Sequence, residues 1–400
     1  MRVCGKLTST GEVVTLTLER NKITHIHNGA LPADIGDSSV WLSAGFNDIQ
    51  LNGYGGEDFN LDAWGSAAEV GHNLPLLFEK VAKSGTALLC PTLTTNSAEA
   101  ICQALRNLSE LLNAERTFAN RVVGIHVEGP YISEEDGPRG AHPLEHVRNP
   151  DWEEFQRFQE AAEGRIRILT LAPELPNALP FIEKVVESGV VIALGHTGAD
   201  VSVIRDAVHA GATLATHLGN GAHSLIRRHP NYIWEQLAHD SLYASLISDG
   251  HHLPASVLKS MTRAKGAERT VFVSDAVALG GLPAGVYMGG RYEVLPTGKI
   301  VLAGTPYLAG AGHLLDTCLA NALAMTDLTL AQITASASAN PARVLGLEGT
   351  RGHIRVGYSA DLTLFKLPIE EGTPLKIEAT LCAGEVIYRA KATSVEPREK

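Results

Sequence analysis

The sequence predicts an α/β protein: a TIM-like (β/α)8 barrel with a small β-sandwich built from both termini. Between about residues 44 and 349, eight short apolar segments alternate with amphipathic helical patterns. Both ends of the chain instead carry short alternating runs separated by turn residues, which is typical of antiparallel strands. Polar side chains follow several of the apolar segments, as they do at the carboxyl face of a parallel barrel.

The eight expected barrel strands are residues 44–50, 86–91, 122–127, 166–171, 190–195, 212–217, 243–248 and 270–274. Amphipathic stretches predict the covering helices, for example 98–112, 151–163, 178–187 and 199–210, with a last helix near 309–325. A doubly wound sheet is the alternative, but it needs fewer units and usually has a G-x-G-x-x-G turn. The Gly-Tyr-Gly-Gly stretch at 53–56 lacks that spacing.

The two ends of the chain have the same pattern of short predicted strands separated by turns. Strands are expected at 13–18 and 23–26 near the start, and at 362–365 and 385–388 near the end. We therefore expect residues 1–43 and 350–400 to form one discontinuous β-sandwich domain, and residues 44–349 to form the catalytic barrel.

Composition excludes several classes of function. With 400 residues, 44% of them hydrophobic, and a net charge of −11, the chain is not expected to bind nucleic acid or acidic membranes. Its five cysteines are dispersed and odd in number, which favours a reduced compartment. The first residues lack the long apolar stretch of a signal peptide, and no apolar run of 18 residues occurs in the sequence, so we expect neither secretion nor a membrane span. We expect a cytoplasmic protein that acts on a small molecule.

Four side chains at predicted strand ends carry the expected chemistry: Glu128, His196, His217 and Asp275. Two histidines and a glutamate provide three metal ligands and leave one position open for water. A divalent ion lowers the pKa of that water toward about 7. Asp275 is placed to take a proton from the water and to return it to a leaving amine. The pattern predicts metal-assisted hydrolysis of an amide.

One divalent ion per subunit is expected, most suitably zinc, although iron, cobalt or manganese fit the same ligands. Gln50 and Asn52 lie two residues apart at the end of the first barrel strand. Amide side chains are weak ligands, so they do not predict a second metal, but Gln50 could hydrogen-bond the metal-bound water. His25-Ile26-His27 lies outside the expected barrel and is interpreted as a surface strand pair.

Longer segments resemble the amidohydrolase superfamily, and within it the N-acetylglucosamine-6-phosphate deacetylase family. The similar segments run in order along nearly the whole chain: Gly45–Gly53, Pro91–Leu93, Gly124–Pro130, Leu171–Glu174, Gly195–Thr197, Ala215–Asn220, Asp249–His252, Ser274–Ala276, Asn340–Arg343 and Ala360–Leu362. The resemblance implies a metal-dependent hydrolase barrel that removes acetate from N-acetylglucosamine 6-phosphate.

The resemblance also implies roles for individual residues. Glu128, His196 and His217 match the metal ligands, and Asp275 matches the catalytic acid/base. The substrate contacts it implies are His142 near the acetyl group, where it could stabilise an oxyanion, His252 at the sugar, and Asn220, the Gly221 backbone and Arg228 at the phosphate. Arg227 is the alternative to Arg228. In the family this arginine can reach into the neighbouring subunit, which implies a homodimer.

The departures from the family pattern concern substrate recognition. They are Gly219-Asn220-Gly221-Ala222, Arg228-His229-Pro230-Asn231, and the segment 304–309. They leave open N-acetylgalactosamine 6-phosphate, an unphosphorylated N-acetyl sugar or an N-acyl amino acid as the substrate. A third hypothesis is a non-catalytic barrel that serves as a scaffold. The presence of all three metal ligands and of Asp275 argues against it.

Overall fold

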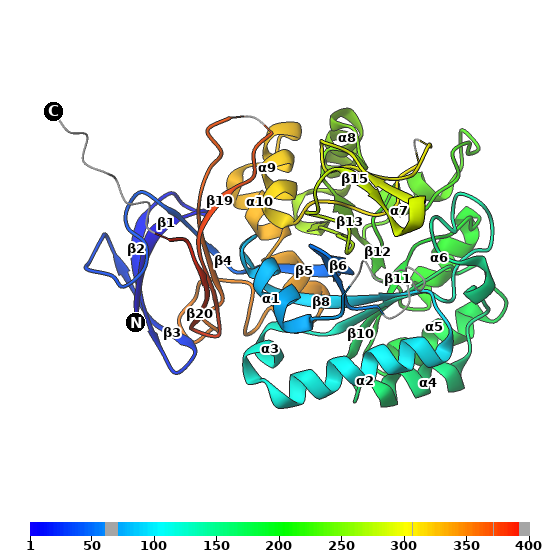
Figure 1. Ribbon diagram of the computed structural model, residues 1–400, viewed down its shortest axis with the longest axis horizontal. Coiled ribbons are helices and arrows are strands. Elements are labelled where there is room, and N and C mark those ends of the chain that lie inside the picture. Colours follow the sequence, from blue (N-terminus) through cyan, green and yellow to red (C-terminus); the bar gives the residue numbers. More distant parts are fainter. Residues whose placement is uncertain (61–70, 306, 371, 392–400) are drawn as a thin grey trace.

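A computed structural model describes residues 1–60, 71–305, 307–370 and 372–391 (Figure 1). Eight parallel strands form a nearly closed barrel, as the sequence predicts. In spatial order they are β5 (Phe46–Leu51), β8 (Thr86–Thr94), β9 (Ile125–Glu128), β10 (Ile166–Leu171), β11 (Val191–Leu194), β12 (Leu214–Ala215), β13 (Tyr243–Ile247) and β14 (Thr270–Val273). Just beyond β14, the Asp275 N–H donates to the Gln50 carbonyl at 2.9 Å, which joins the last strand to the first.

Helices cover the outside of the barrel (Figure 1). They are α1 (Leu74–Ala82), α2 (Ala98–Ala114), α3 (Arg116–Arg121), α4 (Trp152–Ala161), α5 (Ala178–Glu187), α6 (Val201–His209), α7 (Tyr232–Ala238), α8 (Ala255–Lys265), α9 (Leu315–Met325), α10 (Leu330–Ser336) and α11 (Ala339–Val344). Helix α2 illustrates why these segments form helices that pack on the barrel. The Ser97 hydroxyl caps its first turn, and one face buries apolar residues at helical spacing, namely Ile101, Leu105, Leu108 and Leu112. Among the described residues, no helix has both the length and the apolar character that a membrane span requires.

A separate sheet is assembled from both ends of the chain, which confirms the prediction of a terminal β-domain. Its seven strands lie in the order β20 (Glu385–Arg389), β19 (Lys376–Cys382), β18 (Leu362–Lys366), β4 (Trp41–Ala44), β1 (Arg2–Leu7), β2 (Val13–Glu19) and β3 (Lys22–Asn28). Hydroxyls tie this sheet to the barrel: Thr363 donates to the Gly85 carbonyl at 2.6 Å and Thr380 to that of Ala82 at 2.8 Å. The domain boundaries at 43/44 and 349/350 stay a prediction.

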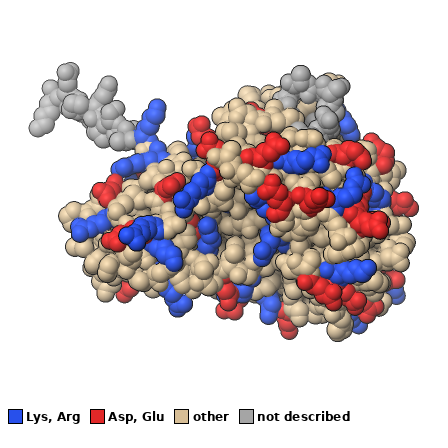
Figure 2. Space-filling model, turned by 90° about the horizontal axis from the view of Figure 1, so that it is seen from below, with Lys and Arg blue, Asp and Glu red and all other residues tan. Residues whose placement is uncertain are grey.

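Two small sheets complete the described residues. Strands β6 (Gly53–Tyr54) and β7 (Glu57–Asp58) follow the first barrel strand, and β15 (Gly285–Tyr287), β16 (Tyr292–Val294) and β17 (Ile300–Leu302) follow the eighth. On the face seen in Figure 2, acidic and basic side chains are interspersed. This mixture does not resemble the one-sign basic surface that nucleic acids require.

Asp48 in β5 is fully buried, and one of its carboxylate oxygens has no hydrogen-bond partner among the described residues. Burial raises its pKa from 3.8 to about 7. The folded state therefore holds this proton more tightly than the unfolded state does. The bound proton therefore stabilises the folded state, and this stabilisation is complete below pH 3.8. It decreases by about 1.4 kcal/mol per pH unit as the pH rises from 3.8 to about 7, and it is lost above that pH.

Asp48→Asn should remove this pH dependence. We expect the melting temperature of the variant, relative to the natural chain, to be higher at pH 8 than at pH 5. Scanning calorimetry of both proteins at the two pH values measures the difference. A constant difference in melting temperature would contradict a raised pKa at Asp48.

Candidate active site

Glu128, His196 and His217 come together at the carboxyl ends of β9, β11 and β12. His217 Nε2 lies 2.9 Å from Glu128 Oε1 and 3.0 Å from His196 Nε2, and His196 Nε2 lies 3.1 Å from the same carboxylate oxygen. Ligands bound at about 2.0–2.1 Å to a tetrahedral ion would be about 3.3 Å apart. The three buried groups therefore have the separations and the chemistry of a divalent metal site.

Neighbouring groups orient two of these three side chains. The Pro138 carbonyl accepts from His196 Nδ1 at 2.8 Å, which leaves the Nε2 lone pair directed at the other two groups. Gln50 Nε2 donates to Glu128 Oε1 at 3.0 Å, so Gln50 supports the carboxylate directly. Burial opposes the charge on Glu128, but the contacts of its carboxylate with His196 and His217 outweigh burial and hold the pKa of Glu128 well below its usual range.

The backbone at the strand ends is unusual. His196, His217 and Asp275 have φ values of 52°, 29° and 49°. Left-handed backbone is uncommon for residues other than glycine, and it concentrates at functional sites. Each strand therefore leaves the sheet abruptly at its chemically active residue.

Asp275 lies at the same rim. Asn52 Nδ2 donates to Asp275 Oδ1 at 2.8 Å, which fixes one carboxylate oxygen. Burial, together with the nearby Glu128 carboxylate, raises the pKa of Asp275 to about 6. A carboxyl with a pKa near neutrality is suited to exchange protons during catalysis.

A cavity of about 390 Å³ opens over these groups. Besides the three metal-site residues and Asp275, it is lined by His142, Asn220, Gly221 and His252. Of the candidate site residues named from the sequence, the structure brings all but Arg227 and Arg228 to this site. Gln50 lies behind Glu128, while Arg227 and Arg228 are exposed and do not line the cavity. The role of Arg228 stays a prediction.

Two of the lining histidines are held by residues that the sequence reasoning missed. His142 Nδ1 pairs with the Thr95 hydroxyl at 2.8 Å, and its ring stacks edge-on against His196 at 4.3 Å. Burial and the adjacent His196 lower the pKa of His142 to about 3. His252 Nδ1 pairs with Asp249 Oδ2 at 2.8 Å. Thr95 directly follows β8, so the strand-end criterion could have found it.

Arg291 is the one lysine or arginine that lines the cavity among the described residues, and the sequence reasoning missed it. It directly precedes β16, in the small sheet that follows β14, and its guanidinium lies over the ring of the buried Tyr292. It does not follow a barrel strand, so no sequence signal linked it to the site.

The H-x-H segment lies apart from this cavity. His25 and His27 are exposed on β3, and their rings stack at 5.9 Å. This position confirms the interpretation of a surface strand pair.

Gly221 must lack a side chain. Its φ is +53°, and an added Cβ would lie 2.8 Å from His196 Nδ1 and 3.3 Å from His217 Cε1. Gly221→Ala should displace the His196 ring and lower metal affinity by about 10–100-fold. Gly189→Ala is the matched control, because Gly189 also has positive φ (+82°) but nothing within 4 Å. Metal titration of both variants measures the effect, and equal affinities would contradict the steric argument.

Comparison with known proteins places the chain among hydrolases. A model described as "Amidohydrolase family" matches residues 41–388. N-acetylglucosamine-6-phosphate deacetylase of Bacillus subtilis (strain 168) is 31% identical over 383 residues, covering 95% of this chain and 92% of that protein. N-acetylgalactosamine-6-phosphate deacetylase of Escherichia coli O157:H7 is 31% identical over 303 residues, covering 74% and 79%. The crystal structure of N-acetyl-D-glucosamine-6-phosphate deacetylase from Mycobacterium smegmatis superposes with a TM-score of 0.83 at 29% identity, covering 97% of this chain and 100% of that one.

Proposed function

This chain belongs to the amidohydrolase family, and we propose that it is a metal-dependent deacetylase acting on N-acetylglucosamine 6-phosphate. The products are glucosamine 6-phosphate and acetate. The observation that carries the proposal is the meeting of Glu128, His196 and His217 beside Asp275 at the barrel rim. The substrate class, a phosphorylated N-acetyl amino sugar, is that of the relatives, which are N-acetylglucosamine-6-phosphate deacetylases.

The donor set fits one divalent metal, and zinc is our proposal because it suits two imidazoles and a carboxylate in a hydrolytic site. Bound there, a divalent ion supplies Lewis acidity, which polarises a carbonyl oxygen and lowers the pKa of water. Gln50 and the Pro138 carbonyl keep Glu128 and His196 in the required orientations.

Asp275 moves the proton in this proposal. It accepts a proton from the water whose oxygen attacks the acetyl carbon. It then delivers that proton to the amide nitrogen as the C–N bond breaks. His142, neutral because of its lowered pKa, donates to the acetyl oxygen when the Thr95 hydroxyl donates to its Nδ1.

Acetate release tests the proposal directly. The purified chain, loaded with Zn²⁺, should hydrolyse N-acetylglucosamine 6-phosphate faster than N-acetylgalactosamine 6-phosphate, N-acetylglucosamine or an N-acetyl amino acid. A preference for the galactose epimer would instead favour the second candidate, which the Escherichia coli relative supports. Absence of hydrolysis with every substrate, in protein that retains metal, would refute the deacetylase.

We further propose that Arg291 contacts the substrate phosphate from within its own chain. Charge-assisted hydrogen bonds to phosphate contribute about 2 kcal/mol, so Arg291→Ala should raise KM for the phosphorylated sugar about 30-fold. KM for unphosphorylated N-acetylglucosamine should change little. The comparison uses steady-state kinetics with both sugars. An equal effect on both would contradict phosphate recognition by Arg291.

Arg228→Ala is the companion variant. A rise in KM for the phosphorylated sugar alone would support the expected contribution of Arg228 from a neighbouring subunit, and light scattering should then give the mass of a homodimer. Leu225 and Trp234, which are close to this arginine in sequence, have exposed apolar side chains that support a subunit contact there.

A cytoplasmic location is also proposed. The five cysteines are free and buried, which supports a reducing compartment.

A further inference from the structure

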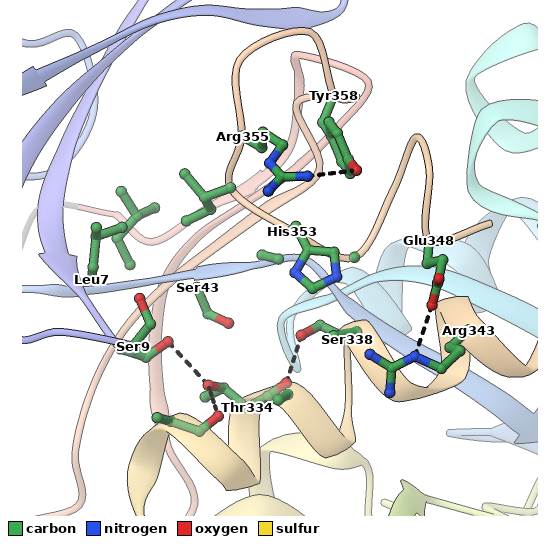
Figure 3. Close-up of a pocket in the computed structure, with 18 of the residues that line it drawn as sticks. Leu7, Ser9, Ser43, Thr334, Ser338, Arg343, Glu348, His353, Arg355 and Tyr358 are labelled. Atoms are coloured by element: carbon green, nitrogen blue, oxygen red, sulfur yellow. Dashed lines mark hydrogen bonds and ion pairs between the residues drawn. The ribbon is translucent and has the colours of Figure 1, made fainter. Parts of the chain in front are cut away.

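A second cavity, of about 540 Å³, lies where the terminal sheet meets the barrel helices (Figure 3). One side is formed by the end of β1, the residues after it, and β4. The other side is formed by α10, α11 and the segment 348–358. This cavity shares no lining residue with the catalytic cavity. It lies beside Ala44, before β5 begins, and therefore near the amino-terminal end of that barrel strand.

One wall of the cavity is cationic. Arg343, His353 and Arg355 line it, and Glu348 is the one carboxylate among its lining residues. Glu348 is already engaged, since its Oε2 accepts from Arg343 Nε at 2.7 Å. The Arg355 guanidinium contacts the Tyr358 hydroxyl at 3.5 Å and the face of its ring, and it has no carboxylate partner among the described residues.

His353 lies within the field of both arginines. Its partial burial and the charges of Arg343 and Arg355 lower its pKa, while Glu348 opposes them. The wall therefore carries an excess of positive charge that the protein's own carboxylates do not neutralise. A bound anion would relieve this repulsion.

The opposite wall presents hydroxyl groups. Figure 3 shows Ser9 and Ser43, from the side formed by β1, the residues after it and β4, across the cavity from Arg343 and His353. Ser43 in β4 lines the cavity and its hydroxyl makes no hydrogen bond among the described residues, whereas the Ser338 hydroxyl donates to the Thr334 carbonyl at 2.6 Å. The Ser43 hydroxyl is therefore free to pair with a ligand in the cavity.

We propose that this cavity binds a small phosphate ester. The planar forks of two arginines match the oxygens of a phosphate, and the Ser43 hydroxyl supplies a further donor from the other wall. The volume exceeds what inorganic phosphate fills and suits a metabolite. Leu7 and Ile354, which are only partly buried, offer apolar surface to the rest of such a molecule.

A ligand held here would contact both the terminal sheet and the barrel helices. It would bind the folded chain and not the unfolded one, and so stabilise it. Ser43 also leads directly into β5, whose far end places Gln50 against Glu128. The cavity is thus connected by one continuous segment to the catalytic site.

Crystals of the full chain soaked in sodium selenate test the location, because selenate is a tetrahedral oxyanion with an anomalous signal. We expect a peak within hydrogen-bond distance of Ser43 Oγ and of the Arg343 or Arg355 guanidinium. Anomalous peaks confined to the catalytic cavity or to the outer surface would overturn the proposal.

Equilibrium dialysis of the zinc-loaded protein tests it in solution, with radiolabelled inorganic phosphate and glucosamine 6-phosphate as probes. Arg355→Ala and Ser43→Ala should each weaken one binding event per chain at least tenfold, with the ester bound more tightly than free phosphate. Arg106→Ala, an exposed arginine on α2, is the matched control and should leave binding unchanged. Melting curves without ligand show that each variant is folded. Unchanged binding in all three variants would overturn the proposal, even if a selenate peak is present.

Discussion

Asp275→Asn is expected to lower kcat by about 10²–10⁴-fold while the protein still binds one divalent ion per chain. The amide has nearly the shape of the carboxylate and can still pair with Asn52, so the cavity keeps its geometry. It cannot accept the proton of the attacking water. Steady-state acetate release, with metal content measured on the same samples, separates loss of proton transfer from loss of the ion.

The exposed Asp240 provides a matched control for this substitution. Asp240→Asn removes the same charge far from the metal ligands and should leave kcat unchanged. Near-normal kcat in metal-loaded Asp275→Asn would contradict the assignment of Asp275 as the group that moves the proton.

Loss of a metal ligand should have a different signature. Glu128→Ala and His217→Ala each remove one of three ligand atoms that lie about 3 Å apart. Even outer partners of metal ligands typically contribute 10–100-fold in metal affinity, so we expect a loss greater than roughly 100-fold. Acetate release should fall with the metal content, as measured by elemental analysis after dialysis.

His25→Ala is the control for these variants, because His25 belongs to the exposed histidine pair on β3. Its metal content should match that of the natural chain. Chelation should inactivate the natural chain and His25→Ala, and added Zn²⁺ should restore both. Full metal occupancy in both ligand variants would disprove the site.

Local patterns were sufficient to predict the architecture. β-branched apolar segments alternate along the chain with segments of 3.6-residue periodicity, and this alternation predicted all eight barrel strands. A strand of a parallel barrel is buried on both faces, by the helices outside and by the barrel interior, so it is a continuous apolar run. The strand ends were less accurate. The sixth strand was expected to span 212–217, but β12 ends at Ala215, because His217 turns into left-handed backbone.

The metal-site residues could also be found from the sequence. In a parallel barrel all carboxyl strand ends face the same side, so Glu128, His196, His217 and Asp275 had to approach one another although about 150 residues separate the first from the last. Residues outside this rule were missed. Arg291 reaches the cavity from the segment between β15 and β16 of a small antiparallel sheet, so it follows no barrel strand.

The sequence by itself therefore determined the barrel, the terminal sheet and the four residues at the strand ends, since each follows from short-range periodicity and from the fixed direction of parallel strands. Only the tertiary structure decided which side chains orient them, which arginine faces the catalytic cavity, and that a cationic cavity lies beneath Ser43. Those features depend on contacts between loops and sheets that are distant in sequence, and no local pattern encodes the distance between such segments.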